Sequence, residues 1–295
     1  MWHANPPLHS AREVGEACAQ ETKNNDLASR LRESLPELEK NSLIFRQAAS
    51  KYQLHDLKPE QFMIQKMDDA EMINLYSGRL GRKSGKPTGI IRRRLLESSL
   101  HGRCCYCQES IADTLDHFVP KSYIPSLAIE PWNLVPACIK CNMVLNQNFS
   151  ADASEQMPHP YMLPEEGRWL YAEASCEEGL TIEFFANPSN NFPQTVKDQI
   201  IAGFNALKLR SRFAESIAPF LVETQSALLR NFNESSAEEV KEYLLEISDD
   251  AFRAFCGLHH KDGCLCRETT NSQRGALLEA LAHNDEYCAG AFADA

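Results

Sequence analysis

Residues 104–142 read CCYCQESIADTLDHFVPKSYIPSLAIEPWNLVPACIKCN, and four of the cysteines in this segment recur at regular spacing. It holds two Cys-x-x-Cys pairs, Cys104 with Cys107 and Cys138 with Cys141, with 30 residues between the pairs. Each pair places two thiolates at the spacing that a tetrahedral Zn²⁺ requires, and two pairs complete a four-ligand structural site. The sequence therefore predicts a zinc site that closes a short segment of chain.

Cys105 is separated from Cys107 by one residue, a spacing that suits binding of one zinc ion less well than the two-residue spacing of Cys104 and Cys107. We therefore expect that Cys105 is not a ligand. Spacing alone leaves an iron–sulfur cluster open as an alternative for the four cysteines. If the metal is structural zinc, its removal should unfold the segment, because metal affinity is then part of the folding free energy.

Between and beside the cysteine pairs lie side chains that a structural zinc site does not need. Asp116 and His117 are adjacent, Asn133 lies 16 residues after His117, and Asn142 directly follows Cys141. Phosphodiester hydrolysis needs a base that deprotonates water and a hard cation that stabilises the leaving oxygen. A neutral imidazole suits the base near pH 7, and carboxylate and amide oxygens suit a Mg²⁺ that keeps several waters.

In this order, Cys-x-x-Cys, LDHFVPKS, WNLVPAC and KCN resemble the HNH endonucleases, also called ββα-metal or His-Me finger nucleases, over residues 104–149. The resemblance implies that His117 is the general base and that Asp116 and Asn142 bind the catalytic Mg²⁺ or Mn²⁺. It also implies that Asn133 holds the backbone and ring orientation of His117. Zinc at the four cysteines would staple a finger that is otherwise too small to hold the site rigidly.

The sequence departs from the resemblance at one position. Many HNH proteins carry a lysine three residues after the last asparagine, where this chain has Leu145. The phosphate contact that such a lysine gives must then come from elsewhere or be absent, and Lys121 and Lys140 are the nearest candidates. This departure bears on the rate more than on the class of reaction.

Charge is segregated along the chain, whose formal net charge is −11. Residues 150–295 carry 11 basic and 24 acidic side chains, whereas residues 79–103 carry eight basic side chains and one acidic one. A positive block beside a nuclease-like finger favours a nucleic-acid contact over a merely solvated face, because phosphate neutralisation dominates affinity. The candidate contacts are Arg79, Arg82, Lys83, Lys86, Arg92, Arg93, Arg94 and Arg103, together with Lys121 and Lys140.

The chain is predicted to have four regions. Residues 1–78 form a helical region that begins with a loose polar arm over 1–25, and Asp68 with Glu71 forms a capping box. Residues 79–103 form a flexible basic loop and a helix from 90 to 100, and residues 104–160 form the finger. Residues 161–295 form a hairpin over 167–188 and an acidic helical region, with helices over 197–232 (broken), 235–258 and 274–284.

Three further features each allow two interpretations. His159, in the HPYM sequence after the finger, is a candidate to approach the metal site, although a packing role fits it equally well. CGLHHKDGCLC (256–266) is a second zinc candidate of uneven spacing, set against ordinary cysteines and histidines. Tyr76 and Tyr106 are interpreted as core residues, with base stacking as the alternative.

Composition and the absence of an apolar run of about 18 residues predict a cytoplasmic protein with no membrane contact. We expect an α+β fold, mainly α-helical, with an embedded ββα zinc finger that hydrolyses nucleic acid. Double-stranded DNA is the preferred substrate, and RNA is not excluded. The alternatives are a non-catalytic zinc module that binds DNA or protein, and a nuclease subunit that needs a partner such as an ATPase. The wider likeness of LYSGRL, RRRLLE, HPYMLP and NSQRGALLEAL to a bacterial HNH subgroup with helical extensions implies a link to anti-phage defence.

Overall fold

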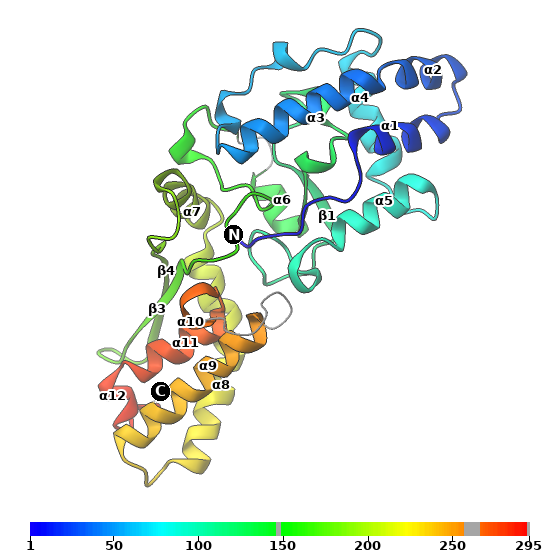
Figure 1. Ribbon diagram of the computed structural model, residues 1–295. Coiled ribbons are helices and arrows are strands. Elements are labelled where there is room, and N and C mark those ends of the chain that lie inside the picture. The colour runs from blue at the N-terminus through cyan, green and yellow to red at the C-terminus, as the bar shows by residue number, and fades with distance from the viewer. Residues whose placement is uncertain (146–148, 257–265, 294–295) are drawn as a thin grey trace. The chain divides into compact units, whose positions relative to one another are not determined.

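The computed structural model describes residues 1–145, 149–256 and 266–293, and the chain divides into two compact units, Met1–Leu163 and Pro164–Ala295 (Figure 1). The structure is 57% helical, with small two-stranded sheets. The predicted α+β, mainly helical class is therefore confirmed. Within the described ranges, no helix is both long enough and apolar enough to cross a membrane.

The first unit consists of helices and a small antiparallel hairpin. The α-helices are α1 (Ala11–Gln20), α2 (Asn25–Glu33), α3 (Leu35–Ser50), α4 (Asp69–Leu75), α5 (Pro87–Leu96) and α6 (Ile139–Leu145). Short 3₁₀ turns are η1 (Leu54–Asp56), η2 (Pro59–Phe62), η4 (Leu100–Gly102), η5 (Pro125–Leu127), η6 (Pro131–Asn133) and η7 (Ala153–Glu155).

The predicted loose arm over residues 1–25 is wrong. Ser10 and Glu13 form a capping box at the start of α1, because the Ser10 side chain accepts from the Glu13 amide and the Glu13 carboxylate accepts from Ser10. Met1 and Trp2, which precede the helix, are buried. The next helix, α2, is capped by the Asn24 side chain.

The predicted capping box of Asp68 and Glu71 is confirmed at the start of α4. The chain then continues into a π-helical turn, η3 (Tyr76–Leu80), so the basic segment is not a loop from its beginning. The helix that follows, α5, begins at Pro87 and ends at Leu96, earlier than predicted. Close packing fixes Gly89 here, because a Cβ at this position would lie 2.2 Å from the Ser84 carbonyl oxygen.

The antiparallel hairpin consists of β1 (Thr114–His117) and β2 (Leu134–Ala137), and α6 follows directly. Asp116 pairs with Val135, and His117 pairs with Leu134. One buried apolar cluster joins α1, α4 and α5 to the hairpin through Leu115 and Leu134. The two strands are thereby held against the helices that precede them in the sequence.

The second unit confirms the hairpin and helices expected there. Strands β3 (Leu170–Ser175) and β4 (Thr181–Ala186) pair antiparallel. The helices are α7 (Gln194–Ala206), α8 (Leu209–Asn231), α9 (Ala237–Cys256), α10 (Cys266–Thr269), α11 (Gln273–Ala282) and α12 (Asp285–Cys288), with a 3₁₀ turn η8 (Ala291–Ala293). The predicted break in the long helical stretch falls between α7 and α8, where Lys208 has a φ of 52°.

One buried acid of the first unit carries a testable consequence. Glu130 is 3% exposed, and its carboxylate accepts hydrogen bonds from the Ser42 hydroxyl and the Trp132 amide. Burial raises the pKa of Glu130 to about 7, with these bonds and Arg46 acting in the opposite direction. The folded state therefore holds this proton more tightly than the unfolded chain does.

We expect Glu130→Gln to remove the loss of stability that this carboxyl causes as the pH rises from acidic to neutral values. A raised folded-state pKa contributes stability below the unfolded pKa, and that stability is lost as the pH rises through about 7. The difference in free energy of unfolding between the variant and the wild type should shift in favour of the variant by up to about 3 kcal/mol when the pH is raised from 4.5 to 8. Urea denaturation at both pH values measures this, and an equal difference at the two would contradict it.

Candidate functional site

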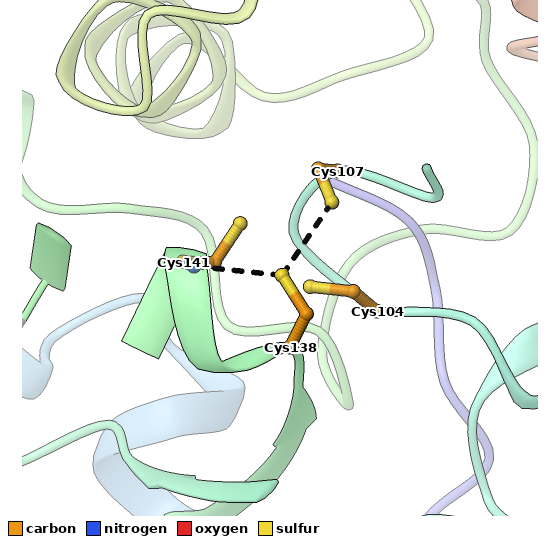
Figure 2. A group of neighbouring side chains, drawn as sticks. All are labelled: Cys104, Cys107, Cys138 and Cys141. Carbon is orange, nitrogen blue, oxygen red and sulfur yellow. Dashed lines mark hydrogen bonds between the residues drawn. The ribbon is translucent and has the colours of Figure 1, made fainter. Parts of the chain in front are cut away.

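Four buried cysteines of the first unit converge at one point. Cys104 and Cys107 lie in the turn before β1, Cys138 follows β2, and Cys141 lies on α6 (Figure 2). Their sulfur atoms lie within 4.8 Å of one another, and those of Cys107 and Cys138 are 3.9 Å apart. Tetrahedral zinc with Zn–S bonds of about 2.3 Å places its sulfurs about 3.8 Å apart, so the cluster fits the ion.

The four thiols are close enough to shift one another's pKa values. Hydrogen bonds within the cluster lower the pKa of Cys107 to about 7 and lower that of Cys138 further, whereas the pKa values of Cys104 and Cys141 are raised. Thiolate is the form that binds metal, and deprotonation is favoured at two of the four positions. Cys105 is buried but is not part of this four-cysteine cluster.

The first residues of the chain pack against the turn that carries Cys104 and Cys107. The Trp2 amide donates to the Cys105 carbonyl oxygen at 2.8 Å, and the Ala4 amide donates to the Pro160 carbonyl oxygen at 3.1 Å. This contact was not predicted, because backbone hydrogen bonds leave no pattern in residue type. The cysteine turn is thus covered by a segment about 100 residues away in the chain.

Asp116 and His117 are the last two residues of β1. His117 is 8% exposed, and its Nε2 lies 2.9 Å from the Ala128 carbonyl oxygen. Since a carbonyl only accepts, Nε2 carries the proton and the lone pair of the neutral ring is on Nδ1. Burial lowers the pKa of His117 to about 4, so the imidazole is neutral at pH 7. The Tyr76 ring meets it edge-on, with centroids 4.3 Å apart.

The Asp116 carboxylate is buried and held by two donors. The Tyr106 hydroxyl donates to Oδ2 at 2.8 Å, and the His117 backbone amide also donates to the carboxylate. Burial raises the pKa of Asp116 to about 7, whereas these bonds and the cationic Lys121 lower it. Burial also raises the pKa of Tyr106 well above its ordinary value, so the phenol remains a donor.

Asn133 is fully buried beneath the loop that joins the two strands. Its Oδ1 accepts from the Val119 amide at 2.7 Å, and its Nδ2 donates to the carbonyl oxygens of Val119 and Leu127. Its own carbonyl accepts from the Phe118 amide. Asn133 therefore fixes the backbone on both sides of the loop, directly after His117 and directly before Ala128, which binds the His117 ring.

Asn142 lies in the middle of α6 and contacts the strand that carries Asp116. Its Nδ2 donates to the Thr114 Oγ1 at 3.1 Å, and Thr114 lies on the same face of β1 as Asp116 because strand residues alternate. This side chain is half-buried, and its amide oxygen is a hard ligand. The Asp116 carboxylate and the Asn142 amide oxygen are ligand types that Mg²⁺ or Mn²⁺ accepts, and Mg²⁺ needs only one or two protein ligands besides water.

The basic residues predicted to contact nucleic acid differ in their exposure to solvent. Arg92 was predicted to contact nucleic acid, but it is buried and its guanidinium donates to the Asp113 carbonyl oxygen at 2.7 Å, so that prediction is wrong. The physical reason is that Arg92 lies on the side of α5 that packs against the hairpin. The exposed candidates are Arg82, Lys83, Lys86, Arg93, Arg94, Arg103 and Lys140, and Arg79 and Lys121 are half-buried.

Two other candidates from the sequence are His159 and the CGLHHKDGCLC segment. His159 is buried, its Nε2 lies 3.0 Å from the Trp132 carbonyl oxygen, and its ring packs on Phe118, so it has a packing role in this structure. Burial lowers its pKa to about 3. The second zinc candidate, CGLHHKDGCLC, lies almost wholly outside the described residues.

Lys121 is the cation that lies near the predicted catalytic pair. Its Nζ lies 5.8 Å from the centroid of the Tyr76 ring, and its charge acts on the pKa values of both Asp116 and His117. Leu145 stands at the end of α6, where the resemblance leads one to expect a lysine. The sequence did not assign Tyr76 or Tyr106 to this site, since an aromatic residue beside a finger is most simply a core residue.

Comparison with known proteins gives partial similarities. The chain is 29% identical over 165 residues to protein ea31 of Escherichia phage lambda, a match that covers 54% of this chain and 55% of ea31. It is 40% identical over 63 residues to the Septu protein PtuB of Bacillus thuringiensis, covering 20% of this chain and 23% of PtuB. The chain thus spans about half of one relative and a quarter of the other. No family model and no solved structure matches it.

Proposed function

We propose that this protein is an HNH-type endonuclease that hydrolyses phosphodiester bonds of nucleic acid, with double-stranded DNA as its preferred substrate. His117 takes the proton of the attacking water on Nδ1. Asp116 and Asn142 would hold Mg²⁺ or Mn²⁺, which would supply charge stabilisation at the leaving 3′-oxygen. Zinc bound by the four-cysteine cluster would keep the hairpin and α6 together.

The observation that carries the proposal is the state of His117. It is neutral and buried, and a carbonyl oxygen fixes its tautomer, at the end of the strand that also carries Asp116. A general base near pH 7 requires a neutral ring with one oriented lone pair. His159 is also neutral, buried and held by a carbonyl oxygen, so the feature that sets His117 apart is its position next to Asp116 at the end of β1.

The experiment is cleavage by the purified full chain, loaded with zinc. Supercoiled plasmid, linear duplex, single-stranded DNA and RNA are each incubated with Mg²⁺, with Mn²⁺ and with EDTA. We expect the supercoiled plasmid to be cleaved when Mg²⁺ or Mn²⁺ is present and to remain intact with EDTA. Absence of cleavage on all four substrates would contradict a nuclease that acts alone.

A second candidate is a nuclease subunit that acts only with a partner protein such as an ATPase. The partial similarity to the Septu protein PtuB supports a setting in anti-phage defence. Divalent-cation binding by an inactive isolated chain, with cleavage restored by its partner, would distinguish this candidate from the first.

We also propose that the exposed basic residues of the segment 79–103 hold the phosphate backbone. The double variant Lys83→Glu/Lys86→Glu is expected to weaken DNA binding. The slope of log K against log salt concentration should become shallower by about 0.9 for each phosphate that the variant no longer neutralises. Lys51→Glu/Lys58→Glu, with the same charge change at exposed lysines of the same unit, is the control. Fluorescence anisotropy at several salt concentrations measures both, and equal effects of the two pairs would contradict the assignment.

A further inference from the structure

The first cysteine pair contains a side chain that reaches the predicted catalytic site. Tyr106 lies between the cysteine-cluster members Cys104 and Cys107, and its side chain is 1% exposed. Its hydroxyl crosses to the end of β1 and donates to Asp116 Oδ2 at 2.8 Å. One side chain therefore joins the turn that carries the cysteines to the carboxylate proposed to bind the catalytic cation.

The position of Tyr106 is restricted from both ends. The two residues before it are held by backbone hydrogen bonds, because the Cys105 amide donates to the Pro136 carbonyl oxygen and the Cys104 amide donates to the Ser110 carbonyl oxygen. The Gln108 amide closes the turn by donating to the Cys104 carbonyl oxygen. A phenol on so constrained a backbone has little freedom, so the carboxylate oxygen that it binds is also fixed.

The two donors on Asp116 leave a defined part of the carboxylate for a metal. Tyr106 occupies one lone pair of Oδ2, and the His117 amide holds the carboxylate at the backbone. A carboxylate has about four acceptor positions, so lone pairs remain for a cation. Because rotation about χ2 is restrained by the phenol, these lone pairs keep one direction.

We propose that Tyr106 is a positioning residue, which orients the Asp116 carboxylate for the divalent cation and couples the cysteine cluster to the catalytic site. This inference rests on the proposed function. Residues that orient a metal ligand through a hydrogen bond commonly contribute about 10–100-fold to metal affinity. A Tyr106 that only fills the core would contribute to stability and leave metal affinity unchanged.

The test measures Mn²⁺ binding to the zinc-loaded full chain by the EPR signal of free Mn²⁺. Tyr106→Phe keeps the ring and removes the donor, and we expect its Mn²⁺ dissociation constant to rise about tenfold. Zinc content should stay equal to that of the wild type. In the cleavage assay, the Mg²⁺ concentration for half-maximal rate should rise by a similar factor, and the rate should recover at saturating Mg²⁺.

Tyr161→Phe is the matched control. Tyr161 is also buried in the first unit, and its hydroxyl donates to a backbone oxygen, that of Leu134, at 2.7 Å. The variant should lose stability without losing Mn²⁺ affinity. Asp116→Asn is the reference for a broken metal site.

These measurements distinguish a failure of the role proposed for Tyr106 from a failure of the proposed metal site. Wild-type Mn²⁺ affinity in Tyr106→Phe, together with weakened binding in Asp116→Asn, would overturn the role of Tyr106 alone. Equal weakening in Tyr106→Phe and Tyr161→Phe would also overturn it, since removal of any buried hydroxyl would then suffice. A wild-type chain that binds no Mn²⁺ would overturn the metal site and the role of Tyr106 with it.

Discussion

Cys138→Ser is expected to abolish zinc binding and to unfold the hairpin and α6, which carry Asp116, His117 and Asn142. The sulfur of Cys138 lies among those of the other three cysteines, 3.9 Å from that of Cys107 (Figure 2). Structural zinc contributes about 10–16 kcal/mol of apparent binding free energy to small zinc domains. Whole proteins are stable by only roughly 5–15 kcal/mol, so the apolar contacts of Leu115 and Leu134 cannot replace it.

Zinc content by mass spectrometry and hydrogen exchange over residues 104–145 measure this effect. Cys105→Ser is the control, because Cys105 is equally buried but lies outside the four-cysteine cluster. It should retain one zinc per chain. A Cys138→Ser chain that keeps wild-type amide protection in this segment would show that the cluster does not support the fold.

Asp116→Asn is expected to lower the rate of Mg²⁺-dependent cleavage by on the order of a thousandfold, with zinc content and fold retained. The cation is proposed to supply several kcal/mol of transition-state stabilisation, and each 1.4 kcal/mol is about tenfold in rate. Asparagine keeps the size of the side chain and an oxygen that accepts from Tyr106, so packing is preserved while the negative charge is removed.

Initial rates across a range of Mg²⁺ concentrations measure this second effect. Asp113→Asn, at an exposed acid just before the same strand, is the control and should cleave normally. Cleavage by Asp116→Asn at the wild-type rate and Mg²⁺ dependence would remove Asp116 from the metal site.

The sequence predicted features whose information is local. Two cysteine pairs at fixed spacing lead to one cluster, and the capping box of Asp68 and Glu71 and the hairpin over 167–188 follow from neighbouring residues. The corresponding box of Ser10 and Glu13 carries the same local information, but the polar composition of residues 1–25 concealed it.

Features that depend on distant parts of the chain were not predictable from one sequence. Arg92 has the composition of a phosphate contact, but the packing of α5 on the hairpin turns its guanidinium to the Asp113 carbonyl. The tautomer of His117 depends on the Ala128 carbonyl, and the orientation of Asp116 depends on Tyr106. These are three-dimensional contacts between residues whose types do not specify a partner.

The proposed role of His117, as the general base of a metal-dependent phosphodiesterase, is tested most directly by a paired measurement. The initial rate of plasmid cleavage is compared for wild type and His117→Ala at saturating Mg²⁺ and equal zinc content. A general base contributes about 10²–10⁴-fold, so we predict loss of detectable cleavage in the folded variant. Cleavage by His117→Ala at the wild-type rate would contradict this role and the proposed mechanism with it.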